Sequence, residues 1–343
     1  MSKSTMMRRA LCVTALSAVM GLFIGAQSPA AAQAITMKIG MVTINDPIHD
    51  FSKRFAEEIN KRSNGRINAE VYPAGQLGKA ARQIENLQFG TQEVYVSPPG
   101  FLAGINPAFT TVDAPGIFRD IPHAHAVVTQ PAFRSHFLDL AKSRGIVGVS
   151  LWAYGPTAVA ASKPIKTMDQ LKGLKVRILA SEIERSTVEA MGMSGVPMDF
   201  TETLQAIQNG TIDGTRTSMV VMGGMKFQNT VKNVLRDNTG IIFTGAWVSK
   251  GWFDKLPKDL QQVVLDVGRD LDMFGTKISQ DYELATEKEW ADAGVTISKL
   301  DAGQQKELFA RVSGIGDKLM ANNPRTAETW KLLQAALKAV DAK

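Results

Sequence analysis

Short apolar segments alternate with amphipathic ones near the start of the chain, and this alternation constrains the fold more than any other feature. Met37–Thr43, Ile67–Tyr72 and Glu93–Ser97 have the length and the β-branched or aromatic content of strands. Between them, Asp46 and the proline after it are typical of a helix start, and Lys79–Gln88 has helical spacing. Strands that alternate with helices build an open α/β sheet, whose ligand crevice lies beyond the carboxyl ends of the strands.

The same pattern continues through the rest of the chain. Ile146–Trp152 and Lys175–Ile178 are predicted strands, and the capping box Ser181–Glu184 opens a helix. From Pro257 to Ala293 a helical pattern runs for about 36 residues, or ~50 Å. Because this length exceeds one small domain, we expect the helix to cross two lobes of a hinged clamshell.

The N-terminus has the organisation of a secretory signal peptide. Three basic residues precede the apolar run Ala10–Ala26, and the A-x-A sequence Ala32–Ala34 ends the segment. The run is short for a membrane span, so an uncleaved anchor is the weaker alternative. We expect residues 1–34 to be removed during export, which places the mature protein in the periplasm.

Composition excludes several classes of function. The one cysteine, Cys12, lies inside the predicted signal peptide, so we expect the mature protein to have no disulfide and no thiol chemistry. Removal of the signal peptide takes three basic residues and no acidic ones from a net charge of +6, which leaves +3. This charge is too small to indicate nucleic-acid binding, and the remaining 309 residues (343 − 34) predict two domains.

The motifs and histidines do not indicate catalysis. The sequence contains no nucleotide-binding glycine motif, nucleophile elbow or zinc-protease motif, so it predicts neither an enzyme nor a cofactor. His123 and His125 could chelate a metal from a strand, but Ile121-Pro122 ahead of them indicates a helix start. On a helix that spacing directs the two rings apart, so we expect solvated or capping roles and no metal site.

The middle of the chain carries the residues from which a family is identified. Lys163–Thr167 (KPIKT) and Asp169–Arg177 (DQLKGLKVR) stand in close order. They resemble the signature K-P-I-x-T-x-x-D-L-K-G-L-K-[IV]-R of the DctP-type extracytoplasmic solute-binding proteins of tripartite ATP-independent periplasmic (TRAP) transporters. Further matching segments extend the resemblance over nearly the whole mature chain, in order: Tyr72–Gly78, Gly195–Glu202, Ala206–Gly214, Val248–Lys250, Trp252-Phe253 and Leu256-Pro257.

The resemblance implies a type II-like periplasmic binding-protein fold, with two α/β lobes joined by hinge strands and a long lobe-spanning helix. The expected boundaries are 35–154 with 243–282 for lobe I and 155–242 with 283–343 for lobe II. It further implies delivery of a ligand to a membrane permease of one small and one large subunit, driven by an ion gradient without an ATPase. The residues do not distinguish a monomer from a homodimer.

Arg177 is the residue for which the sequence argues a ligand role most firmly. It matches the family's carboxylate-binding arginine, and a guanidinium pairs with a carboxylate through two parallel hydrogen bonds. It also lies at the end of a predicted strand, and such ends face the crevice of an open sheet. Without the resemblance, a lone arginine after a strand would be interpreted as a structural or surface residue.

Other pocket positions of the family carry different residues in this chain. Thr157, Thr217 and the Ser97-Pro98 pair stand where many members have charged or polar anchors. A pocket with fewer polar groups suits a ligand with fewer hydroxyls, because a buried polar group needs a partner. We therefore expect a monocarboxylate with an aromatic or aliphatic body rather than a sugar acid. Four aromatic residues could enclose that body, with core packing as the open alternative for each: Trp152, Tyr154, Phe200 and Trp247.

The role of Arg216 and the purpose of binding leave alternatives open. Arg216 either adds a second positive group to the cleft, which would suit a dicarboxylate, or points to solvent, which is favoured here. A sugar acid or a dicarboxylate is the alternative to the favoured cargo. A binding protein could also present its ligand to a chemoreceptor or a sensor kinase. An enzyme on the same fold would need a nucleophile–base pair that the sequence does not reveal.

Overall fold

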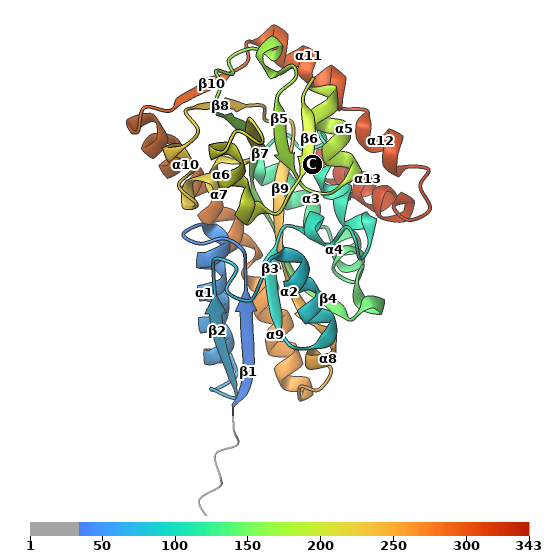
Figure 1. Ribbon diagram of the computed structural model, residues 1–343. Helices are drawn as coiled ribbons and strands as arrows, with labels where there is room; N and C mark the ends of the chain where they lie inside the picture. Colours follow the sequence, from blue (N-terminus) through green and yellow to red (C-terminus); the bar gives the residue numbers. More distant parts are fainter. Residues whose placement is uncertain (1–33, 343) are drawn as a thin grey trace, which may run out of the picture. The chain divides into compact units, whose positions relative to one another are not determined.

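Ten strands and the helices around them make up residues 34–342, which the computed structural model describes (Figure 1). Of the predicted signal peptide, only Ala34 lies within the described residues. The strands are β1 Ile35–Gly40, β2 Ile67–Tyr72, β3 Val94–Ser97, β4 Ile146–Ala161, β5 Lys175–Ile178, β6 Ser194–Pro197, β7 Gly214–Ser218, β8 Asn233–Arg236, β9 Ile241–Ser249 and β10 Thr296–Lys299.

The α-helices are α1 Pro47–Arg62, α2 Ala80–Phe89, α3 Ile121–Val128, α4 Pro131–Leu138, α5 Glu182–Ala190, α6 Phe200–Gln208, α7 Met219–Gly224, α8 Lys250–Phe253, α9 Lys258–Asp270, α10 Asp272–Asp292, α11 Ala302–Val312, α12 Ile315–Met320 and α13 Ala327–Asp341. Short 3₁₀ helices are η1 Pro99–Leu102, η2 Pro107–Asp113, η3 Lys142–Arg144, η4 Met168–Leu171 and η5 Phe227–Asn229. None of the helices within residues 34–342 combines the length and the apolarity needed to cross a membrane.

The strands form one ladder whose two halves share β4. In the first half, β2, β1, β3 and β9 lie side by side, and β9 pairs antiparallel with Ile146–Pro156 of β4. In the second half, β7 pairs antiparallel with Thr157–Ala161 of β4, and β5 and β6 follow β7 in parallel. β4 therefore passes from one half to the other at the point where Figure 1 shows the lower and upper groups of elements meeting.

β4 is longer than the predicted strand Ile146–Trp152, because the chain passes through Gly155-Pro156 without ending the strand. A register shift between Ala153 and Gly155 absorbs the irregularity, as bulges do. A side chain at Gly155 would come within 2.6 Å of the Ser218 hydroxyl, so glycine allows β4 and β7 to approach closely here. Glycine and proline thus mark a bulge inside a strand and not a strand end.

Several local predictions are confirmed. The strands at Ile67–Tyr72 and Lys175–Ile178 form over the predicted residues. Asp46 caps α1, where its carboxylate accepts the backbone N–H of His49 at 3.0 Å. Ser181 caps α5 by accepting the backbone N–H of Glu184 at 3.4 Å.

The predicted single helix over 257–293 is two helices, α9 and α10, which meet at Leu271 with φ −91° and ψ −2°. The next residue, Asp272, is held by β4: its carboxylate accepts the Ser150 hydroxyl at 2.6 Å and the Leu151 backbone N–H at 2.9 Å. This anchor coincides with the interruption between the two helices, which helical periodicity cannot reveal. Both helices pack on β4, and α10 continues to α7 and β10, so the pair still contacts both halves of the ladder.

Candidate functional site

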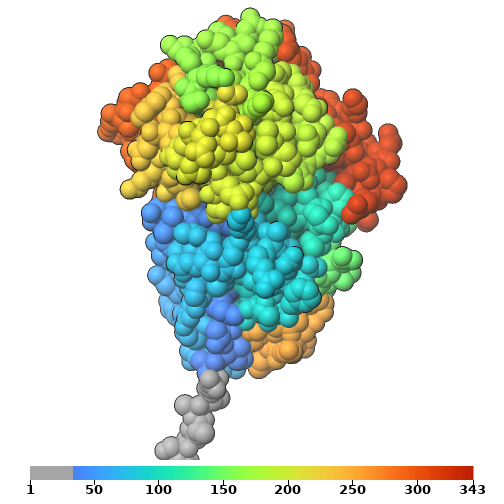
Figure 2. Space-filling model, in the orientation of Figure 1, coloured from blue at the N-terminus to red at the C-terminus, as the bar shows by residue number. Residues whose placement is uncertain are grey.

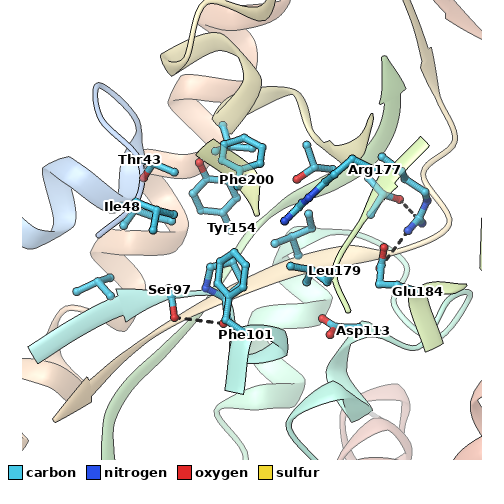
Figure 3. Close-up of a pocket in the computed structure, with 18 residues that line it drawn as sticks. Thr43, Ile48, Ser97, Phe101, Asp113, Tyr154, Arg177, Leu179, Glu184 and Phe200 are labelled. Atoms are coloured by element: carbon cyan, nitrogen blue, oxygen red, sulfur yellow. Dashed lines mark hydrogen bonds and ion pairs between the residues drawn. The ribbon is translucent and has the colours of Figure 1, made fainter. Parts of the chain in front are cut away.

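A cavity lies where the two halves of the ladder meet, and seven of the nine predicted ligand-binding residues line it (Figure 3). They come from the ends of β3, β5 and β7, from the middle of β4 and from the start of α6: Ser97, Pro98, Tyr154, Thr157, Arg177, Phe200 and Thr217. Arg216, for which a cleft position was the less favoured alternative, also lines the cavity. The lining residues that sequence reasoning did not nominate are Val42, Thr43, Ile48, Val96, Phe101, Asp113, Leu179, Glu184, Val221 and Ile242.

The cavity is closed off on the face seen in Figure 2, where α6 and α7 (yellow) meet the segments of α1 and α2 (blue to cyan) without an opening between them. Lys79, just ahead of α2, forms an ion pair with Glu202 of α6 across this seam. Gly75 approaches Thr201 at the same place: a side-chain carbon at Gly75 would lie 3.9 Å from the Thr201 methyl group. Contacts between the two sides therefore cover the cavity on this face.

Arg177 presents a buried positive charge to the cavity. The residue is 3% exposed, and its Nε donates a hydrogen bond to the Met198 carbonyl at 3.0 Å. Its Nη2 is enclosed and has no hydrogen-bond partner among residues 34–342. Burial lowers the pKa of Arg177 to about 10, because the charged form loses its hydration without gaining an ion pair. A buried guanidinium with a free N–H group is a receptor for an anion.

Phe200 supports the guanidinium. The Cζ atom of Arg177 lies 5.2 Å from the centroid of the Phe200 ring, which is cation–π distance. The ring stacks in turn on Phe227, with centroids 5.7 Å apart and planes within 9°. The α6 start and the segment after α7 thus fix the position of the guanidinium from one side.

Arg216 is buried, which corrects the expectation that it points to solvent. It is 4% exposed, and its guanidinium donates to Asp237 at 3.1 Å and to Glu184 at 3.3 Å. The hydroxyls of Thr157 and Thr239 each accept a further hydrogen bond from it at 2.9 Å. Burial alone would lower its pKa, but the charges of Asp237 and Glu184 raise it above the ordinary value. Sequence spacing could not identify these charged partners, because they come from α5 and the β8–β9 connection.

Asp113 and Glu184 bring two carboxyl groups to the cavity. Asp113 ends η2; the residue keeps some exposure, but its Oδ2 is enclosed and has no hydrogen-bond partner among the described residues. Burial, reinforced by the nearby charge of Glu184, raises the pKa of Asp113 well above its usual range. The Glu184 side chain, on the first turn of α5, is 12% exposed. No motif marked Asp113, since its position depends on how η2 folds against β9.

The smaller predicted residues are committed to the protein's own hydrogen bonds to different degrees. The Thr157 hydroxyl donates to Asp237 at 2.6 Å, so it serves the Arg216 network. The Tyr154 hydroxyl donates to Asp46 at 2.8 Å, which leaves its ring to face the cavity. Ser97 bonds the neighbouring Pro98 carbonyl at 3.3 Å. These side chains therefore define the shape of the cavity wall, while their hydroxyl groups are mostly engaged in hydrogen bonds within the protein.

Trp152 and Trp247 do not line the cavity, and both indoles are completely buried in the core. Trp152 stacks on Phe51 with centroids 4.0 Å apart. Trp247 packs edge-on against Phe109 and donates its indole N–H to the Ser97 carbonyl at 3.1 Å. Trp152 and Trp247 are therefore core residues, which was the alternative left open for each of the four aromatic residues.

The histidine pair lies within α3 as expected, with separate partners for the two rings. His123 contacts the Asp341 carboxylate at 3.2 Å, and His125 contacts the Thr276 hydroxyl at 2.9 Å. Within residues 34–342, no group of three or more potential metal ligands is found.

Comparison with known proteins identifies similar chains over most of this length. The DctP family, described as "Bacterial extracellular solute-binding protein, family 7", matches residues 40–323. The C4-dicarboxylate-binding periplasmic protein DctP of Rhodobacter capsulatus is 31% identical over 255 residues, which cover 71% of this chain and 75% of the relative. A 2,3-diketo-L-gulonate-binding periplasmic protein of Escherichia coli is 26% identical over 318 residues, which cover 91% of this chain and 95% of the relative.

Solved structures share the fold. A TRAP periplasmic solute-binding protein from Desulfovibrio salexigens with bound orotic acid superposes with a TM-score of 0.84 at 24% identity. The match covers 89% of this chain and 99% of that one. Other structures of this fold hold sugar acids, galactonate and β-D-galacturonate among them. The likeness confirms the predicted fold class, a two-lobed, type II-like α/β binding-protein fold.

Proposed function

Because this chain belongs to the DctP family of bacterial extracellular solute-binding proteins, we propose that it captures a small organic acid on Arg177, inside this cavity. The family supplies the solute-binding component of TRAP transporters, so the chain is a transport component and not an enzyme. Such proteins bind small organic acids and work with membrane permeases.

The free guanidinium of Arg177 is the observation that carries the proposal. A buried charge is held at a cost unless a partner of opposite charge pairs with it. Among residues 34–342 the only hydrogen bond to this side chain is the Met198 carbonyl at 3.0 Å. A ligand carboxylate would pair with the guanidinium and occupy the cavity that the two halves of the ladder enclose.

The charges around the cavity support a ligand with one carboxylate. Arg216 is paired with Asp237 and Glu184, so it is not available to a second carboxylate. Asp113 adds a second carboxyl group to the cavity wall, on the same side as Glu184. A dicarboxylate would bring its second charge close to the Glu184 carboxylate, and among the described lining residues Arg216 is already paired and cannot meet it. We therefore favour a monocarboxylate over the C4-dicarboxylate that names one relative.

The body of the ligand is better described as hydroxylated than as aromatic or aliphatic. The sequence-based preference for an apolar body counted the polar anchors missing at Thr157, Thr217 and Pro98, but not Asp113 and Glu184. Two carboxyl groups facing a cavity suit a ligand with hydrogen-bond donors. The relative that aligns over 91% of this chain is named for a sugar acid, which agrees with this revision.

The proposal also covers how the two lobes close on the ligand, where the chain acts and which partner receives the ligand. Lobe I would comprise residues 35–154 and 243–282, and lobe II residues 155–242 and 283–343. The two lobes would move about β4 and β9 near the cavity. The chain would act in the periplasm after cleavage of residues 1–34, as its relatives named periplasmic do. The liganded form would then dock on the small and large permease subunits.

Titration calorimetry on residues 35–343 tests the proposal with sugar acids, dicarboxylates and arenecarboxylates as ligands. We expect one or more monocarboxylates to bind, with sugar acids ahead of succinate and benzoate. Arg177→Met should weaken binding by at least about 30-fold, the loss expected for an unpaired charge in a buried pair. Arg82→Met is the matched control, because Arg82 on α2 is 66% exposed and remote from the cavity. Unchanged affinity in Arg177→Met would overturn the proposal.

A further inference from the structure

The Asp113 carboxyl is an unused polar group in the wall of the cavity. Its Oδ2 has no hydrogen-bond partner among residues 34–342. The oxygen is packed beside the backbone of Gly100 and the Leu179 side chain: a side-chain carbon at Gly100 would lie 2.9 Å from Oδ2 and 2.9 Å from a Leu179 methyl group. Glycine at 100 therefore keeps room for the carboxyl at this position.

Glu184 extends the same wall. Its carboxylate has one hydrogen bond from Arg216, at a long 3.3 Å, so most of its acceptor capacity is uncommitted within the described residues. Figure 3 shows Glu184 and Asp113 on the side of the cavity that also carries Arg177 and Leu179, with Phe200, Tyr154 and Phe101 facing them. The cavity thus has one anion receptor and two carboxyl groups beside it.

Among residues 34–342, Asp113 Oδ2 has no donor and the Glu184 carboxylate has only Arg216, so most of the acceptor capacity of this wall is unused. A cation is a poor occupant for it. The Arg216 guanidinium lies against Glu184, where it would repel a metal ion. A hydroxyl group is a better partner, because it donates to a carboxylate and also accepts from a protonated acid. Burial raises the pKa of Asp113, which favours its protonated form, and a hydroxyl group can pair with the carboxyl in either form.

We propose that Asp113 and Glu184 form a hydroxyl-recognising subsite, which selects hydroxylated monocarboxylates over apolar ones of the same size. The subsite rests on the proposed function, since Arg177 must first hold the carboxylate. It holds the hydroxyl groups of the ligand's body while Phe200 and Phe101 cover the carbon skeleton. Asp113 is then a specificity-determining residue, and Gly100 is the position that gives it room.

Calorimetry with a matched ligand pair tests this subsite: D-galacturonate and cyclohexanecarboxylate, two six-membered rings that differ mainly in hydroxyl groups. In the unaltered protein, galacturonate should bind at least about 100-fold more tightly, the discrimination expected when buried polar groups lose their partners. Asp113→Leu should weaken galacturonate by at least about 30-fold and leave cyclohexanecarboxylate unchanged or tighter. Asp113→Asn, which keeps both a donor and an acceptor, should retain most of the selectivity.

A glycine pair gives a second readout that leaves Asp113 itself intact. Gly100→Ala crowds Oδ2 and should reduce the galacturonate preference, whereas Gly104→Ala should not, because a side chain there meets nothing within 4 Å. A selectivity ratio that survives Asp113→Leu, while Arg177→Met loses both ligands, would refute the subsite and keep the proposed function. Failure of every carboxylate to bind the unaltered protein, or binding that survives Arg177→Met, would refute the proposed function itself.

Discussion

Replacing Arg177 with methionine should make the ligand-free protein slightly more stable while it removes ligand binding. The side chain is buried, and its one hydrogen bond to another part of residues 34–342 goes to the Met198 carbonyl. Methionine has a similar length without the charge, so it keeps most of the packing against Phe200. The sign of the change in unfolding free energy therefore distinguishes two roles. Replacing a binding residue that destabilises the empty site raises the unfolding free energy, whereas replacing a structural residue lowers it.

The size of the effect follows from the pKa of Arg177, which burial lowers from 12.5 to about 10. A folded pKa below the unfolded value means that the charged form is disfavoured by folding at every pH below about 10. The difference of 2.5 units corresponds to about 3 kcal/mol. Removing the charge would recover this cost, but loss of the Met198 hydrogen bond offsets about 1 kcal/mol of the gain, and loss of the cation–π contact offsets about another 1 kcal/mol. The net expectation is a gain of about 1 kcal/mol.

Urea and thermal unfolding of the ligand-free protein measure this difference, with Arg82→Met as the exposed control. The control should stay within about 0.5 kcal/mol of the unaltered protein. Galacturonate should raise the melting temperature of the unaltered protein and of the control, but not of Arg177→Met. A destabilisation of Arg177→Met by more than about 2 kcal/mol would refute the reasoning, because it would mean that the guanidinium is already compensated inside the protein.

Three further substitutions test the surroundings of the site by urea unfolding. Arg216→Met should destabilise the protein by about 3–5 kcal/mol, because it leaves Asp237 buried without its ion pair; a loss below about 1 kcal/mol would contradict this. Burial raises the pKa of Asp46 to about 6, so its contribution to the unfolding free energy should fall by about 2 kcal/mol as the pH rises from 4 to 7; Asp46→Asn should remove that slope, and an unchanged slope counts against it. Gly275→Ala would place a carbon 2.7 Å from the Trp152 ring and should cost about 1–3 kcal/mol, whereas a neutral effect would mean that α10 can shift.

Local signals predicted the elements well where they were strong. The N-cap at Asp46, the N-cap at Ser181 and the strand Lys175–Ile178 each depend on residues within a few positions of one another, and each forms. The second half of the predicted capping box does not form, because the Ser181 backbone N–H bonds the Leu179 carbonyl and the Glu184 carboxylate bonds Arg216. Predictions failed where a contact distant in sequence determines the local structure. The long helix is interrupted where the Asp272 carboxylate accepts a hydrogen bond from β4. A register shift against β9 lets β4 continue through Gly155-Pro156. Periodicity carries no information about such contacts.

The site residues likewise fall into those that the sequence could identify and those that depend on distant contacts. Arg177 could be nominated because it matches a family position and lies near the end of a strand, and its cavity position agrees with that hypothesis. Asp113 could not, because its carboxyl reaches the cavity only through the fold of η2 against β9. Trp152 and Trp247 lie on strands near the cavity, but the side of the strand that each occupies is decided by packing that sequence spacing did not resolve.

A crystal structure of the mature chain with bound D-galacturonate is the most direct test of the central claim, capture of a hydroxylated monocarboxylate on Arg177. We expect both carboxylate oxygens within hydrogen-bond distance of the Arg177 guanidinium, and at least one hydroxyl within hydrogen-bond distance of the Asp113 carboxyl. The Arg216 guanidinium should keep its bonds to Asp237. A carboxylate bound to Arg216 or outside the cavity, with the Arg177 guanidinium still unpaired, would contradict the account.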